Sequence, residues 1–149
     1  MFLFKAAAAT YSKVVKQQLH AFRFSPKEAN ADEFVLLSKN KEDCAPGVGQ
    51  IQHVAKLFDI RVGTAQELDG LFPSVHAGER WNYVVKLYWR KPLSKPLNLS
   101  QVRGLNYKRY DTVQAFAKLD DCDALAIVPH LAKTNPDVLL DLLNNAERP

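Results

Sequence analysis

The residues best suited to a chemical role are the basic and aromatic ones between positions 80 and 110. This window has no aspartate or glutamate, and its eight basic residues are Arg80, Lys86, Arg90, Lys91, Lys95, Arg103, Lys108 and Arg109. The whole chain has a net charge of +4, so the rest of it carries −4. A one-sided positive field favours a polyanionic partner such as nucleic acid. A solvated basic strand edge, which discourages pairing between sheets, is the alternative explanation.

Aromatic side chains could add base recognition to this charge, because a nucleobase is bound by stacking on its face and hydrogen bonding at its edge. Trp81 directly follows Arg80 and is expected to project from the mouth of a strand. Trp89 is expected in the core of the protein. Phe22 and Phe24 flank a change from helix to strand, and the sequence favours core positions for both over an aromatic cage.

Motifs for catalysis or cofactor binding are scarce. The four histidines are dispersed, and none stands at metal-ligand spacing from a cysteine or glutamate. His53 is expected to be a structural histidine within a strand. Gly47 and Gly49 lack the third glycine and the helix of a phosphate-binding loop. Neither Cys44 nor Cys122 has an activating signature. We therefore expect no catalytic residue, no metal and no cofactor.

Length and composition indicate one domain. The chain has 149 residues, of which 47% are hydrophobic and 24% charged, enough for one core. No run of 18 apolar residues could form a membrane span, and the start of the chain does not resemble a secretory signal. Two cysteines are too few for a disulfide scaffold or a zinc site. A cytoplasmic protein without a membrane partner is the expectation.

The first half of the chain is predicted to alternate strands with one helix. Residues 2–5 and 33–38 have the pattern of buried strands, and a longer strand starts at Gly47. The helix is predicted from apolar residues at three- and four-residue spacing, which are Tyr11, Val14, Val15, Leu19 and Phe22. Thr10 or Ser12 is its expected N-cap. One or two helical turns are expected over residues 65–71.

The second half contains the clearest strand, over residues 81–89. The segment KPLSKPLNLS that follows is expected to break regular structure at its prolines. Residues 113–119 and 136–143 are predicted helices, the latter with Asn135 as cap before Pro136. Residues 123–131 fit a strand or a helix equally. These elements predict an α+β fold with a bent or barrel-like sheet flanked by helices.

The order of these elements resembles the PUA-like superfamily, in particular its EVE and YTH branches, which are small barrels that bind modified bases in DNA or RNA. Three passages carry the resemblance: the opening FLFK before a helix, the segment 34–40 followed by a glycine-marked strand from 47, and the strand 80–93 with two tryptophans eight residues apart. Residues 95–99 add a step similar to one in EVE domains. The resemblance implies a single domain over 1–149, with a core of 2–119 and a C-terminal helical extension.

The resemblance also implies roles for individual residues. Lys5 matches the pocket lysine at the end of the first strand, Trp81 the cage tryptophan, and Asp111 an acidic residue that accepts a hydrogen bond from the base. Ser38 and Asn40 match a polar pair at a strand end. Three departures stand out: Ala6 replaces the pocket serine, Tyr110 replaces an arginine, and the second cage aromatic has no counterpart unless Phe22 or Phe24 serves.

The leading hypothesis is therefore a non-catalytic module that extrudes a modified, methylated base of DNA or RNA into an aromatic pocket. Its phosphate contacts would come from Arg80, Lys86, Arg90, Lys91, Lys108 and Arg109. Such modules occur free-standing, or fused to nuclease or motor domains in modification-dependent restriction systems, so a nuclease or motor subunit is a candidate partner. The chain could be a whole protein or an excised specificity domain.

Two other hypotheses come from different functional classes. An ASCH-type hydrolase acting on a modified nucleoside would use Lys5 and Asp111 as general acid and base. A protein-interaction module using the basic face would show no base preference at all. Release of a free base from a nucleoside would favour the hydrolase, whereas salt-dependent binding to modified oligonucleotides would favour the leading hypothesis.

Overall fold

The fold was analysed in a computed structural model, which describes residues 1–39, 50–64, 66–68, 83–111, 115–145 and 147–149, without the side chains of residues 8 and 111. Its elements in chain order are β1 (Phe2–Ala6), α1 (Ala8–Gln17), β2 (Leu19–Phe22), β3 (Phe34–Lys39), β4 (Ile51–Val62), β5 (Tyr83–Leu97), the short 3-10 helix η2 (Leu99–Gln101), α3 (Lys108–Asp111), β6 (Phe116–Lys118), α4 (Asp121–Thr134) and α5 (Pro136–Asn145).

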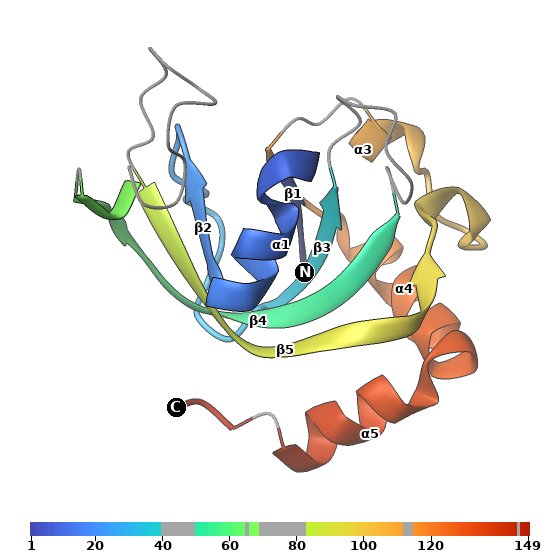
Figure 1. The fold of residues 1–149 in the computed structure, drawn as a ribbon. Helices are drawn as coiled ribbons and strands as arrows, with labels where there is room; N and C mark the ends of the chain where they lie inside the picture. The colour runs from blue at the N-terminus through green and yellow to red at the C-terminus, as the bar shows by residue number, and fades with distance from the viewer. Residues whose placement is uncertain (40–49, 65, 69–82, 112–114, 146) are drawn as a thin grey trace.

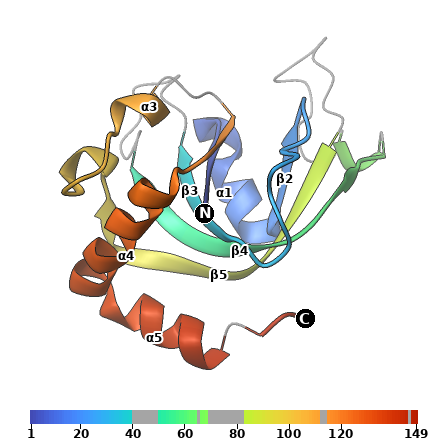
Figure 2. The ribbon, with the colours of Figure 1, turned by 180° about the vertical axis from the view of Figure 1, so that it is seen from behind.

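The strands form one strongly curled sheet (Figure 1). Over the described residues it has six strands in the order β2-β5-β4-β3-β1-β6. Only β1 and β3 are paired in parallel, and the other neighbouring strands are antiparallel. Helix α1 lies within the curl, while α4 and α5 lie outside it (Figures 1 and 2). The predicted α+β fold with a bent, barrel-like sheet flanked by helices is confirmed.

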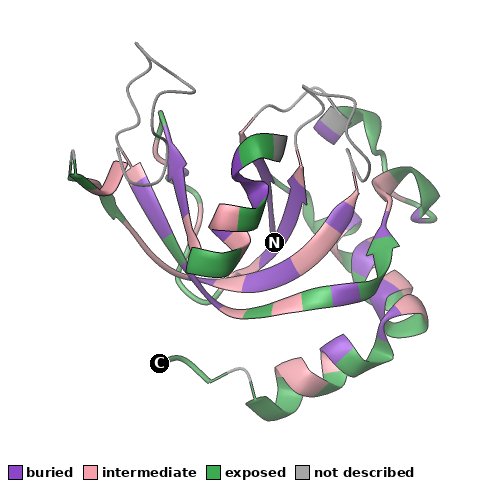
Figure 3. Ribbon diagram, viewed as in Figure 1, coloured by how far each residue is buried: buried purple, intermediate pink, exposed green. Residues whose placement is uncertain are grey.

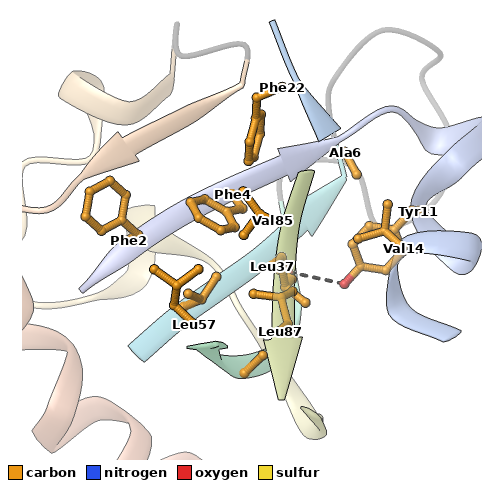
Figure 4. Close-up of a cluster of buried hydrophobic side chains, with 12 residues drawn as sticks. Phe2, Phe4, Ala6, Tyr11, Val14, Phe22, Leu37, Leu57, Val85 and Leu87 are labelled. Atoms are coloured by element: carbon orange, nitrogen blue, oxygen red, sulfur yellow. Dashed lines mark hydrogen bonds between the residues drawn. The ribbon is translucent and has the colours of Figure 1, made fainter. Parts of the chain in front are cut away.

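Two hydrophobic clusters fill the two sides of this sheet. The alternation of side chains along a strand sends Phe2 and Phe4 to one side of β1 and Leu3 to the other. The inner core lies within the curl, where Tyr11 and Val14 of α1 approach the strand residues (Figure 4). The outer core packs β1, β3, β4 and β5 against the buried residues of α4 and α5. Figure 3 shows the outward surfaces of α4 and α5 as largely exposed.

The first helix ends earlier than the sequence predicts. Gln18 has a φ of 56°, in the left-handed region, and it ends α1 after Gln17. Leu19–Phe22 is instead strand β2, which pairs with residues 83–86 of β5. The predicted helix included Leu19 and Phe22 because three-residue spacing also fits them, but pairing with β5 determines their conformation. The N-cap is Ala7 rather than Thr10 or Ser12, and the Thr10 hydroxyl donates to the Ala7 carbonyl at 3.2 Å.

Strand β5 continues through the segment that was expected to break it. Pro92 and Pro96 both lie within the strand. Because β2 pairs only with the first part of β5, the later part has β4 on one side and an open edge on the other. A proline in such an edge strand removes no essential ladder hydrogen bond. The prediction was wrong because edge position is a tertiary property that local sequence does not encode.

The remaining predictions had mixed outcomes. Strands were confirmed at Phe2–Ala6 and Phe34–Lys39, and the helix starting at Pro136 was confirmed. Residues 66–68 form a helical turn, and residues 123–131 lie in helix α4. The predicted helix over 113–119 was wrong, because Phe116–Lys118 is strand β6, paired with β1. The glycines at 47 and 49 lie outside the described residues.

The two edges of the curled sheet are joined by side chains. The first and last strands of the sheet, β2 and β6, face each other across its opening, and the Phe22 and Phe116 ring centroids lie 5.1 Å apart. The His20 Nε2 lies 3.0 Å from the Lys5 carbonyl oxygen, while the Ala21 N–H donates to His20 Nδ1 at 2.8 Å. Because Nδ1 accepts, Nε2 carries the proton and donates to Lys5. The neutral tautomer is therefore fixed by its two partners.

The side chain of Asn135 anchors the C-terminal helices to the open edge of β5. Its Oδ1 accepts hydrogen bonds from the Lys95 N–H and the Ser94 hydroxyl, both at 3.1 Å. Its Nδ2 donates to the Lys95 carbonyl at 3.0 Å. The amide thus takes the place of a neighbouring strand, at a position with 0% exposure. Asn135 was predicted to cap α5, but its side chain forms hydrogen bonds with Ser94 and Lys95 of β5.

We predict that protonation of His20 destabilises the fold at acid pH. Burial lowers the pKa of His20 to about 4 from its ordinary value near 6.5. The unfolded state therefore binds the proton first, and stability is lost as pH falls from about 6.5 towards 4. Over this pH range the free energy of unfolding of the wild type should fall by about 3 kcal/mol more than that of His20→Gln. Urea denaturation of both proteins at several pH values measures the difference, and parallel curves would refute it.

Replacing Asn135 by alanine should cost about 1–3 kcal/mol, because this fully buried amide hydrogen-bonds both the N–H and the carbonyl of Lys95. Asn144→Ala is the matched control, since Asn144 is exposed on α5. It should change the free energy of unfolding by less than about 0.5 kcal/mol. Chemical denaturation measures both variants. Equal stabilities for the two would show that Asn135 does not anchor α5.

Candidate nucleic-acid interface

Two of the residues predicted to contact a base, Lys5 and Ser38, lie side by side at the ends of β1 and β3. Lys5 and Ser38 are direct partners in the parallel register of these strands. Both are buried, with 8% and 2% of their surface exposed. Lys5 Nζ donates to the carbonyl oxygen of Tyr110 at 2.7 Å. Tyr110 belongs to the short helix α3, which ends at Asp111. The structure thus brings Lys5, Ser38 and the backbone of the Asp111 segment together.

Helix α3 is held over Lys5 by the side chain of Tyr110. The Tyr110 hydroxyl donates to the Asp123 carboxylate and accepts from the Asp120 N–H at 3.2 Å. Burial, and then the hydrogen bond to Asp123, raises the pKa of Tyr110, so the hydroxyl remains a donor. The tyrosine at this position therefore fixes the α3 carbonyl that receives the Lys5 ammonium.

Ser38 carries an unsatisfied hydroxyl. Its Oγ is buried and has no hydrogen-bond partner among the described residues. The pairing of β3 with β4 shifts register between Leu37 and Ser38, which marks an irregularity at this position. Leaving such a group unpaired costs about 1–3 kcal/mol. A native structure that keeps one offers a hydrogen-bonding group for a ligand.

The predicted aromatic residues differ in accessibility. Phe22 is 1% exposed in the inner core, where its ring packs against Phe4, His20 and Phe116. Phe24 is 75% exposed, two residues beyond the end of β2. A base could reach Phe24 without disturbing the core. Trp81, Asn40 and Arg80 lie outside the described residues, as does the side chain of Asp111.

Trp89 has a structural position. It is half-buried against the outer core, as expected, and has a φ of 45°. Its Nε1 donates to the Asp141 carboxylate of α5 at 2.8 Å. Lys91 Nζ also approaches Asp141, at 2.9 Å. Trp89 and Lys91 together fasten α5 to β5.

The basic residues predicted to contact phosphates are distributed over β5 and α3. Lys86 Nζ lies 4.8 Å from the centre of the Phe58 ring. Arg109 pairs with Asp120, as Lys91 does with Asp141, and Lys108 is exposed. Exposed ion pairs contribute little to stability, so these cations could exchange a carboxylate for a phosphate at low cost. Arg90 donates to the Val15 carbonyl and lines a cleft beside α1.

The sequence did not predict this cleft, which lies between α1 and strands β3, β4 and β5. It has a volume of about 400 Å³ and is lined by Tyr11, Lys16, Lys39, His53 and Arg90 among others. The Tyr11 hydroxyl lies 2.8 Å from His53 Nδ1, although the two residues are 42 positions apart. No local pattern links residues at that separation. The one available signal was His53, a polar residue within a strand pattern.

Within the described ranges, no three side chains of His, Cys, Asp or Glu come together as a metal site. The helices over those ranges are all too short or too polar to cross a membrane. A second hollow of about 360 Å³ lies between β6 and residues 25–28, directly after Phe24 in the chain.

Solved structures similar to this one share its fold at low sequence identity. ASCH from Zymomonas mobilis has a TM-score of 0.60 and 14% identity, covering 86% of this chain and 93% of that one. The N-terminal domain of Staphylothermus marinus McrB has a TM-score of 0.59 and 10% identity, covering 86% and 92%. A protein from Pseudomonas syringae has a TM-score of 0.57 and 12% identity, covering 87% and 97%.

No protein-family model and no curated protein matches the sequence. At identities of 10–15% the structural likeness concerns the fold alone. It agrees with the expected α+β fold, a curled sheet with flanking helices, and extends over most of each chain compared. Function has to be argued from this chain's own side chains.

Proposed function

We propose that this protein is a non-catalytic nucleic-acid-binding module that recognises a modified, methylated base by extruding it into a pocket at the ends of β1 and β3. The observation that carries the proposal is the buried pairing of Lys5 with Ser38, whose hydroxyl has no partner in the described structure. A base edge presents hydrogen-bonding groups that could pair with the Ser38 hydroxyl. The fold shared with an McrB N-terminal domain and with ASCH domains supports the proposal.

In this mechanism the polar groups read the edge of the base and the aromatic rings hold its face. Lys5 and Ser38 supply donors from the strand ends, and Asp111 and Asn40 complete the polar set from the adjoining segments. In this proposal Trp81 stacks on the base and Phe24, which is exposed, is the second ring. Phe22 is buried in the inner core and is not available for stacking. A methyl group gains apolar contact with an aromatic wall that an unmodified base leaves partly empty. These contacts offset an extrusion cost of a few kcal/mol.

In this proposal the phosphate chain is held by basic residues of β5 and α3, together with Arg80. This set comprises Arg80, Lys86, Arg90, Lys91, Lys108 and Arg109. Contacts to phosphate release counterions, so the affinity falls as salt rises, for modified and unmodified sites alike. The domain, with its core at 2–119 and a C-terminal helical extension, acts in this proposal as the specificity unit of a modification-dependent restriction system. A nuclease or motor subunit, fused or separate, is the proposed partner.

A second candidate function is hydrolysis of a modified nucleoside, with Lys5 and Asp111 as general acid and base. The ASCH domains among the similar structures are the observation that favours it. The two functions differ in their products, because a hydrolase releases a free base from a nucleoside without binding an oligonucleotide. Incubation with modified nucleosides and chromatography of the products distinguishes them.

Recognition of a modified base, here called the reader function, predicts that the protein binds an oligonucleotide with one modified base about tenfold or more tightly than its unmodified counterpart. This is equivalent to about 1.4 kcal/mol. Fluorescence anisotropy measures it with matched DNA and RNA oligonucleotides that carry N6-methyladenine, 5-methylcytosine, 5-hydroxymethylcytosine or no modification, at two salt concentrations. Trp81→Ala should abolish the preference. Trp89→Phe should keep it, because Trp89 contacts α5. If the wild type bound every oligonucleotide equally, its binding would be explained by a basic surface alone, and the reader function would be refuted.

Ser38→Ala should separate binding from stability. Because the hydroxyl is buried without a partner, its removal should leave the free energy of unfolding unchanged or raise it by up to about 1 kcal/mol. The same variant should weaken the base preference several-fold. Ser94→Ala is the matched control: its hydroxyl donates to Asn135, so stability should fall while the preference stays. If Ser38→Ala lost stability and kept its preference, the hydroxyl would be structural.

A further inference from the structure

The cleft beside α1 has the size and lining of a binding site that the proposed base pocket does not use. Its volume of about 400 Å³ falls in the range of small-molecule sites. Val15 and Pro92 give it an apolar part, and the other lining groups include cations and a tyrosine–histidine pair. It is formed by α1, the end of β3, the start of β4 and the middle of β5.

Three cations from three elements line this cleft. They are Lys16 of α1, Lys39 of β3 and Arg90 of β5, and no carboxylate is among the described lining residues. Arg90 is oriented by its hydrogen bond to the Val15 carbonyl, which leaves further guanidinium N–H groups for a ligand. Lys39 Nζ lies 5.4 Å from the centre of the Tyr11 ring. Such convergence of positive charge favours an anion.

A chain of hydrogen bonds fixes the tautomer of His53 in the same cleft. The Tyr11 hydroxyl lies 3.2 Å from the Leu37 carbonyl (Figure 4), and because a carbonyl can only accept, both contacts of the hydroxyl are hydrogen bonds at once only when its proton points to Leu37. The Tyr11 oxygen therefore accepts from His53 Nδ1 at 2.8 Å, and Nδ1 carries a proton. Burial raises the pKa of Tyr11, which keeps this donor in place. Nε2 remains the group of His53 that can gain or lose a proton.

The charge of His53 is sensitive to an anion. Burial, and then the charges of Arg90 and Lys39, lower the pKa of His53. Tyr11 and Lys16 are the titratable groups that α1 adds to the lining. An anion between these groups would offset the positive charges and provide an acceptor for an Nε2–H. Binding would therefore favour the protonated ring.

We propose that this cleft binds one phosphate group of a nucleotide, held by Lys16, Lys39 and Arg90, and that His53 takes up a proton at Nε2 when the phosphate binds. Val15 and Pro92 offer apolar contact to the attached sugar or base. The phosphate is either an internal diester of a nucleic-acid strand or a terminal monoester. The inference rests on the proposed nucleic-acid-binding function only in naming an internal diester as a source of the phosphate.

The first test uses the dinucleotide thymidylyl-thymidine, because its single phosphodiester keeps one charge across the pH range. Calorimetry in two buffers of different ionisation enthalpy counts the protons taken up. Wild type should bind several-fold more tightly at about pH 5.5 than at about pH 7.5, with net proton uptake. Thymidine, which lacks the phosphate, should not bind. Thymidine 5′-monophosphate, compared with the dinucleotide at the higher pH, tells a terminal monoester from an internal diester.

Matched variants identify the residues. His53→Gln should abolish both the proton uptake and the pH dependence, whereas His130→Gln, on the distant helix α4, should change neither. Lys39→Gln and Lys16→Gln should each weaken binding several-fold at both pH values, and denaturation confirms that the variants are folded. The inference would be overturned if wild type bound the dinucleotide with a Kd above about 10 mM. It would also be overturned if His53→Gln bound it with the same pH dependence as the wild type.

The two proposals fail separately. Trp81→Ala should lose the base preference while its pH-linked binding of the dinucleotide persists. If no oligonucleotide shows a base preference but proton-linked binding depends on His53, the reader function is wrong and the phosphate site stands. If the base preference is present but Lys39→Gln and His53→Gln leave dinucleotide binding unchanged, the phosphate site is wrong.

Discussion

The structure depends on how the open side of its curled sheet is closed. The end strands β2 and β6 are not paired with each other. Aromatic packing between Phe22 and Phe116 joins β2 to β6, and the hydrogen bond from His20 to the Lys5 carbonyl joins β2 to β1. The same Lys5 extends its ammonium to the carbonyl of Tyr110 on the other side of the sheet. The backbone of Lys5, the candidate pocket lysine, is thus held by the hydrogen bond from His20, and its side chain by the hydrogen bond to Tyr110 of α3. Loss of the closure would displace the site as well as the core.

Buried polar contacts outside the sheet position the remaining parts of the site. Asn135 replaces a missing neighbour of β5, and Asp141 receives Trp89 and Lys91. Tyr110 joins α3 to the start of α4 through Asp120 and Asp123. Because an unpaired buried polar group is costly, the hydrogen bonds of the buried Asn135, Tyr110 and Asp123 side chains favour one arrangement of the helices, whereas the partly exposed pair of Lys91 with Asp141 adds little. The C-terminal helices therefore contribute to the outer core and, through α4, to the placement of α3 over Lys5.

Sequence patterns predicted the elements whose conformation follows from the periodicity of their own residues. The continuous apolar run of Phe34–Lys39 and the first part of β5 follow directly from strand periodicity. Strand β2 was missed because Leu19 and Phe22 also fit helical spacing, and the edge position that admits Pro92 is visible only in the sheet. The proximity of Lys5 to Ser38 was implied by resemblance to PUA-like domains. The contact of Tyr11 with His53 could not be predicted, since it spans 42 positions and depends on the curl of β4.

Two kinds of positive charge coexist on this fold, and their environments differ. In the basic window of the sequence, Lys91 and Arg109 are paired with carboxylates, so their charge is partly neutralised. Lys16 and Lys39 lie outside that window, yet the fold brings them to Arg90 in a cleft without a carboxylate among its described lining residues. A count of charges along the chain therefore identifies a different surface from the cleft in which the fold gathers Lys16, Lys39 and Arg90. The similar structures share only 10–15% identity with the chain, so the common fold does not assign a function, and any function has to be argued from side-chain placements such as these.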